Sequence, residues 1–338
     1  MTIVERALIG GGATASGMGH VVVMDDSESQ FALTHRSRDL WDELVPEMPV
    51  EVEFERRGTL WVAADEEELA AVSGKKAYYL ERGVETELLD AKALYQAEPG
   101  LRAGMAGGFL VPGDSVIYAP CAANWLSEGA TRVFGDVAEM GDGWVKLRNG
   151  DRLSAQVLIC ATGAWATELF PALPVKPRKG HLAITDRYPG AVHHQLIELG
   201  YLKSAHGHST ESVAFNVQPR KTGQLLIGSS RQYGVEDKAV EQHMVSKMLT
   251  RAVEYLPSIQ KMSVIRLWTG FRAATPDKLP IVGLCPGLKQ TYLATGHEGL
   301  GITTSLGSAE LLLNLVSGQA GILHPADYGA ERFAECRA

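Results

Sequence analysis

The stretch Tyr292–Leu312, YLATGHEGLGITTSLGSAELL, decides the fold class of this 338-residue chain. We expect a strand at Thr291–Ala294, a glycine-rich turn at Gly296–Gly301 and a helix over Ile302–Val316 that ends at Gly318. The first backbone amides of a helix have no partner within it, so a helix that follows a glycine turn can hold an anionic group. The stretch therefore predicts an α/β element with a binding site at the start of its helix.

A second glycine-rich stretch, ALIGGGATASGMGH at Ala7–His20, contains G-x-G-x-x-A, one spelling of the dinucleotide-binding fingerprint. The fingerprint requires a strand before it and a helix after it. After Ala15 the chain runs on as Ser-Gly-Met-Gly, where each glycine costs a helix about 1 kcal/mol, and then as the extended run Val21–Met24. We therefore interpret the stretch as a loop. The apolar run Thr2–Glu5 before it is interpreted as a strand whose final acid, Glu5, takes the ribose hydroxyls of a nucleotide.

The composition is that of an ordinary globular protein. A net charge of −8 without basic clusters argues against nucleic acid as the main partner. The four cysteines are far apart and form no C-x-x-C motif, which favours small core residues in a reduced, cytoplasmic setting over zinc or disulfides. No apolar run approaches about 20 residues, so neither a membrane span nor a secretion signal is expected.

No metal site is expected either. His193-His194 and the His206-x-His208 pair are the candidates, but they lack carboxylates or cysteines at ligand spacing. We interpret all four as loop histidines.

Apolar periodicity predicts the remaining helices and strands. Helices are expected at Ser27–Leu44, Glu66–Arg82, Asp90–Gln96, Pro120–Glu128 and Ala239–Leu256. Strands are expected at Val52–Phe54, Thr59–Ala63, Gln156–Ala161, Lys179–Asp186, Ser212–Gln218, Gln224–Ser229 and Ile265–Trp268. The run at 156–161 is apolar almost throughout, which suits a strand buried on both faces, whereas the runs from 179 to 229 suit an antiparallel sheet. We predict a mixed α/β (α+β) fold of two interleaved units.

Four stretches in order resemble the D-amino acid oxidase superfamily of FAD-dependent amine oxidoreductases, which includes glycine oxidase, sarcosine oxidase and D-amino acid dehydrogenases. They are TIVE with GGGATASGMGH near the start, VLICATGAWATEL at 157–169, LWTGFRAATPDKLPIVG at 267–283, and the quoted stretch at 292–312. The resemblance implies a discontinuous FAD-binding, Rossmann-like domain over 1–45, 112–178 and 266–338. It also implies a substrate domain with an antiparallel sheet over 46–111 and 179–265.

Members of this superfamily begin with a strand, G-x-G-x-x-G and a helix before the strand that we match to Thr2–Glu5. The resemblance therefore implies an incomplete N-terminus of the Rossmann-like domain. A gene model begun at an internal methionine, a truncated chain and a separate partner that supplies the piece are the explanations considered. Each leaves two strand edges exposed and no first helix end to neutralise the pyrophosphate, so the activity of the short chain stays open.

The resemblance also implies site residues. Arg272, in TGFRAATPD, matches a position that binds a substrate carboxylate through its planar guanidinium; the alternative is a surface ion pair, for example with Asp277. The amides at Ile302 and Thr303 are expected to face the flavin and to stabilise its reduced form; the alternative is a turn that only packs a helix. Other residues matched to cofactor-binding positions are Glu5, Thr14, Ala15, Met18, Gly19, Val137, Thr162, Gly163, Trp165, Gly296, Gly299, Leu300 and Gly301. For Val137 and for the segment at Thr162 and Gly163, the alternative is ordinary packing at the end of a strand.

Further catalytic candidates are His20, Tyr201 and Asn216. A lone histidine in a glycine loop is more often a packing or backbone-bonding residue, and this alternative applies to His20. Tyr201 and Asn216, with Phe215 and Tyr233, are candidates for the walls that exclude water from the reaction, although each is equally compatible with a core or surface position.

The implied reaction is the oxidation of an amino acid, either a D-amino acid or a cyclic one such as hydroxyproline, to the imino acid, by hydride transfer to N5 of a non-covalent FAD. Alternatives are an L-amino acid or glycine/sarcosine-type oxidase, and an FAD-free structural or regulatory subunit. Partner subunits, an electron acceptor and a homo-oligomer are compatible with the sequence. The amino acid, its enantiomer and the choice between oxidase and dehydrogenase are not fixed by the sequence.

Overall fold

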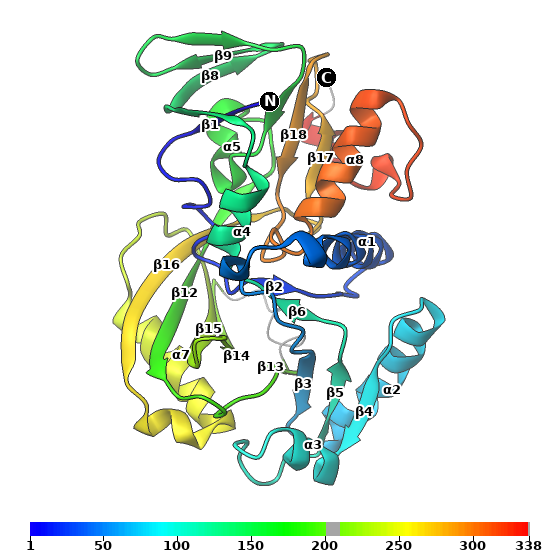
Figure 1. Cartoon of the computed structure of the whole chain (residues 1–338), viewed down its shortest axis with the longest axis vertical. Coiled ribbons are helices and arrows are strands. Elements are labelled where there is room, and N and C mark those ends of the chain that lie inside the picture. The colour runs from blue at the N-terminus through cyan, green and yellow to red at the C-terminus, as the bar shows by residue number, and fades with distance from the viewer. Residues whose placement is uncertain (201–209, 337–338) are drawn as a thin grey trace. The chain divides into compact units, whose positions relative to one another are not determined.

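A computed structural model describes residues 1–200 and 210–336 (Figure 1). These residues form two compact units, each made of segments that are separated in the sequence. Unit 1 comprises Met1–Val52, Ile117–Arg178 and the chain from Phe271 onward, and unit 2 comprises Glu53–Val116 and Lys179–Gly270. The predicted mixed α/β class is confirmed, because each unit contains both strands and helices.

In unit 1, a three-stranded sheet carries the C-terminal helix. β11 (Leu158–Cys160) pairs in parallel with β18 (Thr291–Thr295), and β18 pairs antiparallel with β17 (Ile281–Leu284). α8 (Ser305–Ser317) follows β18 and packs with α1 (Glu28–Leu44) through a shared apolar core. The two helices are in close contact, because a Cβ added to Gly307 of α8 would lie 3.0 Å from the Leu33 side chain of α1.

Shorter elements complete unit 1. β1 pairs in parallel with β7, and β8, β9 and β10 form an antiparallel meander. Their bounds, with those of the remaining helices, are β1 Thr2–Glu5, β2 His20–Val21, α4 Ala119–Leu126, β7 Thr131–Phe134, β8 Val137–Gly141, β9 Trp144–Leu147, β10 Arg152–Ser154 and α5 Ala166–Leu169.

An eight-stranded sheet, in the order β16-β12-β15-β14-β13-β3-β5-β4, makes up most of unit 2 among the described residues. The strand bounds are β3 Thr59–Ala63, β4 Glu87–Asp90, β5 Gly107–Val111, β12 Lys176–Arg187, β13 Gln195–Glu198, β14 Glu211–Pro219, β15 Gln224–Tyr233 and β16 Val264–Ala274. The short strand β6 is Ser115–Val116, and the helices are α2 Glu66–Glu81, α3 Ala91–Ala97 and α7 Gln242–Tyr255.

α7 covers one face of this sheet. The ring of Phe215 on β14 stacks on Tyr255 of α7, with 4.4 Å between centroids and 8° between planes. Phe215 is therefore a core residue. The core position considered for it is the alternative that the structure supports.

Local sequence signals account for several element ends. Ser27 caps α1, since its hydroxyl accepts a hydrogen bond from the Gln30 amide at 3.1 Å. Gly318 ends α8 in the left-handed conformation at φ +68°. The expected strand at Val52–Phe54 is wrong: residues 50–52 form a short 3-10 turn, and Glu53 follows with a φ of +50°. In the described part of the chain, no helix is both long enough and apolar enough to cross a membrane.

Candidate functional site

The loop from Gly296 to Thr304 joins β18 to α8, and its glycines allow close contacts. Gly296 has a φ of +75°, and a Cβ there would lie 2.6 Å from the Thr275 side chain. No larger residue fits this position without a shift of its neighbours.

The end of the loop that meets α8 is held by α1. Trp41 Nε1 donates to the carbonyl oxygens of Ile302 and Thr303, each at 3.2 Å. The Ser37 hydroxyl donates to the Thr303 carbonyl and accepts from the Gly307 amide at 3.0 Å. The Thr303 amide shares its peptide with the Ile302 carbonyl, and a trans peptide places N–H and C=O on opposite sides, so the Thr303 amide points away from the Trp41 donor. This orientation is the one that a ligand at the helix start requires.

The N-terminal glycine loop lies against the same helix start. The Thr303 hydroxyl donates to the His20 carbonyl at 2.8 Å, across 283 positions of sequence. A Cβ added to Gly17 would lie 3.1 Å from the Ile302 side chain, and one added to Gly19 only 2.0 Å from the Ile117 carbonyl oxygen. The two glycine-rich stretches of the sequence therefore meet at one place in unit 1.

Arg272 lies at the other end of the loop. A Cβ added to Gly299 would be 3.5 Å from Arg272 Nε and 3.7 Å from its Cδ, so the half-buried arginine side chain runs along this glycine. Asp277, the alternative ion-pair partner considered for Arg272, binds Arg332 through both carboxylate oxygens, at 2.6 and 3.2 Å. Unit 1 thus brings the arginine and the helix start to opposite ends of one short loop.

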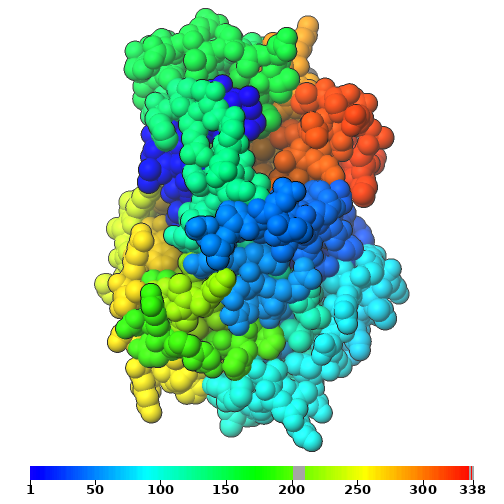
Figure 2. Space-filling view, in the orientation of Figure 1, coloured from blue at the N-terminus to red at the C-terminus, as the bar shows by residue number. Residues whose placement is uncertain are grey.

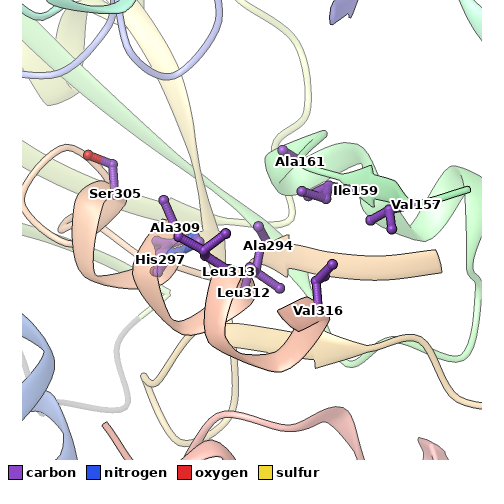
Figure 3. A pocket seen from close by; sticks show the side chains of 12 residues that line it. Val157, Ile159, Ala161, Ala294, His297, Ser305, Ala309, Leu312, Leu313 and Val316 are labelled. Carbon is purple, nitrogen blue, oxygen red and sulfur yellow. Dashed lines mark hydrogen bonds between the residues drawn. The ribbon is translucent and has the colours of Figure 1, made fainter. Parts of the chain in front are cut away.

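A cavity of about 510 Å³ begins at this helix start (Figure 3). Gly301 and Ser305 line it at the helix start. The rest of the lining is mainly apolar and comes from residues 157–161, β18 and α8, with His297 and Ser308 as its polar members. Figure 2 shows that the α8 region, in orange, forms part of the molecular surface. Ile159 in this cavity is 50% exposed, so the prediction that its strand is buried on both faces is wrong. The strand pairs with β18 along one edge and turns this apolar side chain into the open groove.

His297 is the one titratable residue among those that line this cavity, and the sequence analysis did not single it out. Its Nε2 lies 2.9 Å from the Ser308 hydroxyl of α8. Burial lowers its pKa to about 4, so the ring is neutral at physiological pH. Its position inside the glycine turn was the only available sequence signal.

The other predicted residues take the following positions. Gly163 accepts a hydrogen bond from the Thr295 hydroxyl of β18 at 2.7 Å, and Trp165 packs edge-on against Phe271 at 5.4 Å. Glu5 ends β1 and accepts from the Ala7 amide at 2.8 Å, so its carboxylate faces the start of the glycine loop. Val137 begins β8 opposite Leu147.

Two of the predicted catalytic residues, Asn216 and Tyr201, belong to the sequence range of unit 2, and the structure describes only Asn216. Asn216 on β14 is 8% exposed, and its Oδ1 has no hydrogen-bond partner among the described residues. Tyr201 lies outside the described residues, as does the His206-x-His208 pair. Tyr233, considered as a wall, is 43% exposed.

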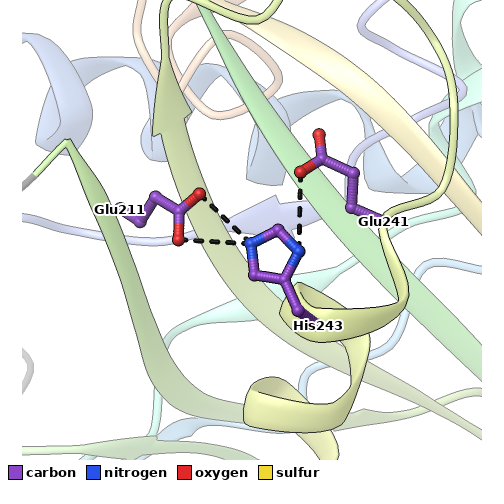
Figure 4. Close-up of side chains that lie close together, drawn as sticks. All are labelled: Glu211, Glu241 and His243. Carbon is purple, nitrogen blue, oxygen red and sulfur yellow. Dashed lines mark hydrogen bonds and ion pairs between the residues drawn. The ribbon is translucent and has the colours of Figure 1, made fainter.

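A second group of titratable side chains lies in unit 2, where the ring of His243 is placed between two carboxylates (Figure 4). Its Nε2 is 3.2 Å from Glu211, and its Nδ1 is 3.7 Å from Glu241. The buried Lys179 also binds Glu241, at 2.9 Å, and Lys247 approaches Glu211 at 3.4 Å. Hydrogen bonds, first of all from Gln232, lower the pKa of both carboxyls, so the group is an ion-pair network that ties β14 to the start of α7.

Comparisons with known proteins give a consistent result. The family model described as DAO, FAD dependent oxidoreductase, matches residues 1–315. The glycine oxidase of Pseudomonas aeruginosa is 27% identical over 352 residues, which covers 97% of this chain and 91% of that protein. The hydrogen cyanide synthase subunit HcnC of Pseudomonas protegens is 28% identical, over 94% of this chain and 79% of that protein. The crystal structure of glycine oxidase from Geobacillus kaustophilus superimposes with a TM-score of 0.87 at 24% identity, covering 98% of this chain and 92% of that one.

Proposed function

Since the chain belongs to the DAO family of FAD-dependent oxidoreductases, we propose that it oxidises an α-amino acid to the imino acid by hydride transfer to N5 of a non-covalent FAD. We propose a D-amino acid or a cyclic amino acid such as hydroxyproline as the substrate. The observation that carries the proposal is the placement of Arg272 and the α8 start at the two ends of one loop.

The residues of unit 1 fit a flavin. Gly19 packs so closely on the Ile117 carbonyl that only a glycine backbone fits there, and the Thr303 amide points away from the α1 donor that holds the Ile302 carbonyl. We propose that the residues that hold the cofactor are Glu5, Thr14, Ala15, Met18, Gly19, Val137, Thr162, Gly163, Trp165, Gly296, Gly299, Leu300, Gly301, Ile302 and Thr303. Bound FAD supplies the two-electron acceptor. The helix-start amides would stabilise the negative charge that reduction places there.

In this proposal Arg272 binds the substrate carboxylate through two parallel hydrogen bonds and thereby fixes the position of the α-carbon. Correct orientation supplies much of the catalysis when the reacting atoms are held about 3–3.5 Å apart, so a strong base is not required. We propose Asn216, His20 and Tyr201 as further catalytic residues, and the buried Oδ1 of Asn216 can accept a hydrogen bond.

The test is anaerobic bleaching of the visible flavin absorbance of the FAD-loaded protein, with matched D-, L- and cyclic amino acids and glycine. Removal of the guanidinium in Arg272→Ala leaves the carboxylate without its charged partner, and we expect kcat/KM to fall by about 100-fold or more. Arg272→Lys keeps the charge but loses the fork, so an intermediate loss is expected. Arg148→Ala, which removes a 62% exposed arginine, is the control and should behave as wild type.

Outcomes are distinct for each alternative. Bleaching by L-amino acids or glycine alone would replace the proposed substrate class with the L-amino acid or glycine/sarcosine-type alternative. A protein that stays colourless with excess FAD would overturn the oxidoreductase proposal in favour of a structural or regulatory subunit. Because one relative is named as a subunit, co-purification of a second polypeptide is measured in the same preparation.

A further inference from the structure

A buried ion pair lies at the Arg272 end of the loop. The guanidinium of Arg178 on β12 binds the carboxylate of Glu298, and the two side chains are 12% and 9% exposed. Charges that are removed from water to this extent need a partner, so loss of either member leaves the other poorly solvated. The pair therefore connects the loop firmly to Arg178, which belongs to unit 1 as the loop does.

The backbone at Glu298 is held as well. Its φ is +51°, a left-handed conformation that residues other than glycine rarely adopt. The Glu298 amide donates to the Ala273 carbonyl at 2.9 Å and forms an isolated bridge with the residue that follows Arg272. A strained residue keeps such a conformation only where its surroundings fix it, and here the ion pair and the bridge do so.

These two contacts determine where Gly299 lies, and Gly299 is the surface along which the Arg272 side chain runs. The other end of the loop depends on different groups, because Trp41 and Ser37 hold Ile302 and Thr303. A change at Glu298 therefore displaces the support of Arg272 while the α8 start keeps its own contacts.

We propose that Glu298, fixed by Arg178, is a positioning residue that orients Arg272 toward the carboxylate of the substrate. The inference rests on the proposed function. In this proposal the Arg178–Glu298 pair controls how tightly the protein binds the substrate carboxylate, and it does not control how tightly the protein binds FAD.

The test compares Glu298→Ala with Glu298→Gln in the FAD-loaded protein. We expect Glu298→Ala to raise KM for the amino acid by about tenfold, with kcat and the dissociation constant of FAD changed by less than about threefold, since misplacement of a binding group reduces affinity first. Glu298→Gln keeps an oxygen that accepts from Arg178 and should restore most of the affinity. Calorimetric binding of propionate, a simple carboxylate, is the readout without turnover and should weaken in parallel.

Asp277→Ala is the matched control. It removes a carboxylate that pairs with another largely buried arginine of unit 1, Arg332, whose side chain is 14% exposed. We expect it to lower the melting temperature and to leave KM and propionate binding unchanged.

An unchanged KM and unchanged propionate affinity in Glu298→Ala would overturn the positioning role while the proposed function stands. If Glu298→Ala lost FAD affinity and kcat to the same extent as substrate affinity, the positioning role would also be overturned, because the two ends of the loop would then not be held independently. Should Glu298→Ala fail to fold, Arg178→Lys gives the same test with an expected threefold rise in KM. If wild type bound neither amino acids nor propionate, the inference and the proposed function would be overturned together.

Discussion

The two ends of the loop between β18 and α8 are held in different ways. At the α8 end, neutral donors from α1 bind the carbonyls of Ile302 and Thr303. At the Arg272 end, a buried ion pair and a backbone bridge fix Glu298. Neutral hydrogen bonds contribute about 1 kcal/mol each, whereas removal of one member of a buried ion pair costs about 3–5 kcal/mol. Because different groups hold the two ends, we expect the proposed cofactor end and the proposed substrate end to respond separately to substitution.

The largest effect is expected at Gly19, which precedes the His20 carbonyl that Thr303 binds and so lies on the proposed cofactor side of this comparison. Gly19→Ala places a Cβ 2.0 Å from the Ile117 carbonyl oxygen at a φ of +90°, so the backbone must shift. We expect a loss of about 3 kcal/mol in the free energy of unfolding and much weaker FAD binding, measured by denaturant titration and by FAD retention.

Gly12→Ala is the control in the same loop, because nothing lies within 4 Å of its added Cβ. Its unfolding free energy should stay within about 0.5 kcal/mol of wild type. Equal losses in the two variants would contradict the view that close approach at Gly19 sets this end of the site.

His297 lies within the loop and contacts Ser308 of α8. We expect this buried ring to make the free energy of unfolding decrease in acid. Its pKa is lowered by burial to about 4, below the unfolded value of about 6.5. The unfolded state therefore binds the proton first, and the stabilisation present above pH 6.5 is lost as the pH falls toward 4. We expect a loss of roughly 2 kcal/mol, less than the full shift implies because the ring borders the cavity.

The measurement is the free energy of unfolding between pH 7 and pH 4 for wild type and His297→Gln. Carboxyl groups with a lowered pKa, such as Glu310 beside Arg36, also lose stabilisation in acid, but they do so in both proteins. The difference between the two curves isolates His297. Parallel curves would show that this ring does not couple protons to the fold.

Much of the fold could be predicted from local patterns. The helix at Ser27–Leu44 and the Gly318 end of α8 follow from a cap, a periodicity and a left-handed glycine, which are properties of short segments. The resemblance to FAD-dependent oxidoreductases is confirmed by the family match over residues 1–315. Burial was harder to predict, since the apolar side chain of Ile159 is half exposed although its run has the composition of a core strand.

Features that depend on contacts distant in sequence could not be predicted. The Arg178–Glu298 pair joins residues 120 positions apart, and nothing near Glu298 in the sequence indicates a partner. The sequence predicted a helix start at Ile302, but α8 begins three residues later, at Ser305, because of another contact distant in sequence. The Ser37 hydroxyl stands between the Thr303 carbonyl and the Gly307 amide, where a helical hydrogen bond would otherwise form.

This inserted hydroxyl gives the smallest predicted effect and the sharpest test of the cofactor end. In Ser37→Ala the Thr303 carbonyl can bond directly to the Gly307 amide, so a new helical bond offsets part of the loss and the unfolding free energy should fall by only about 1 kcal/mol. The helix would then begin one residue earlier, and the peptide between Thr303 and Thr304 would reorient at the proposed cofactor site. We expect FAD to bind several-fold more weakly while KM for the amino acid is unchanged, the reverse of Glu298→Ala. Ser317→Ala, at the far end of α8, is the control and should alter neither constant. A rise in KM equal to the loss of FAD affinity in Ser37→Ala would mean that the loop moves as one body, and the comparison between its two ends would fail.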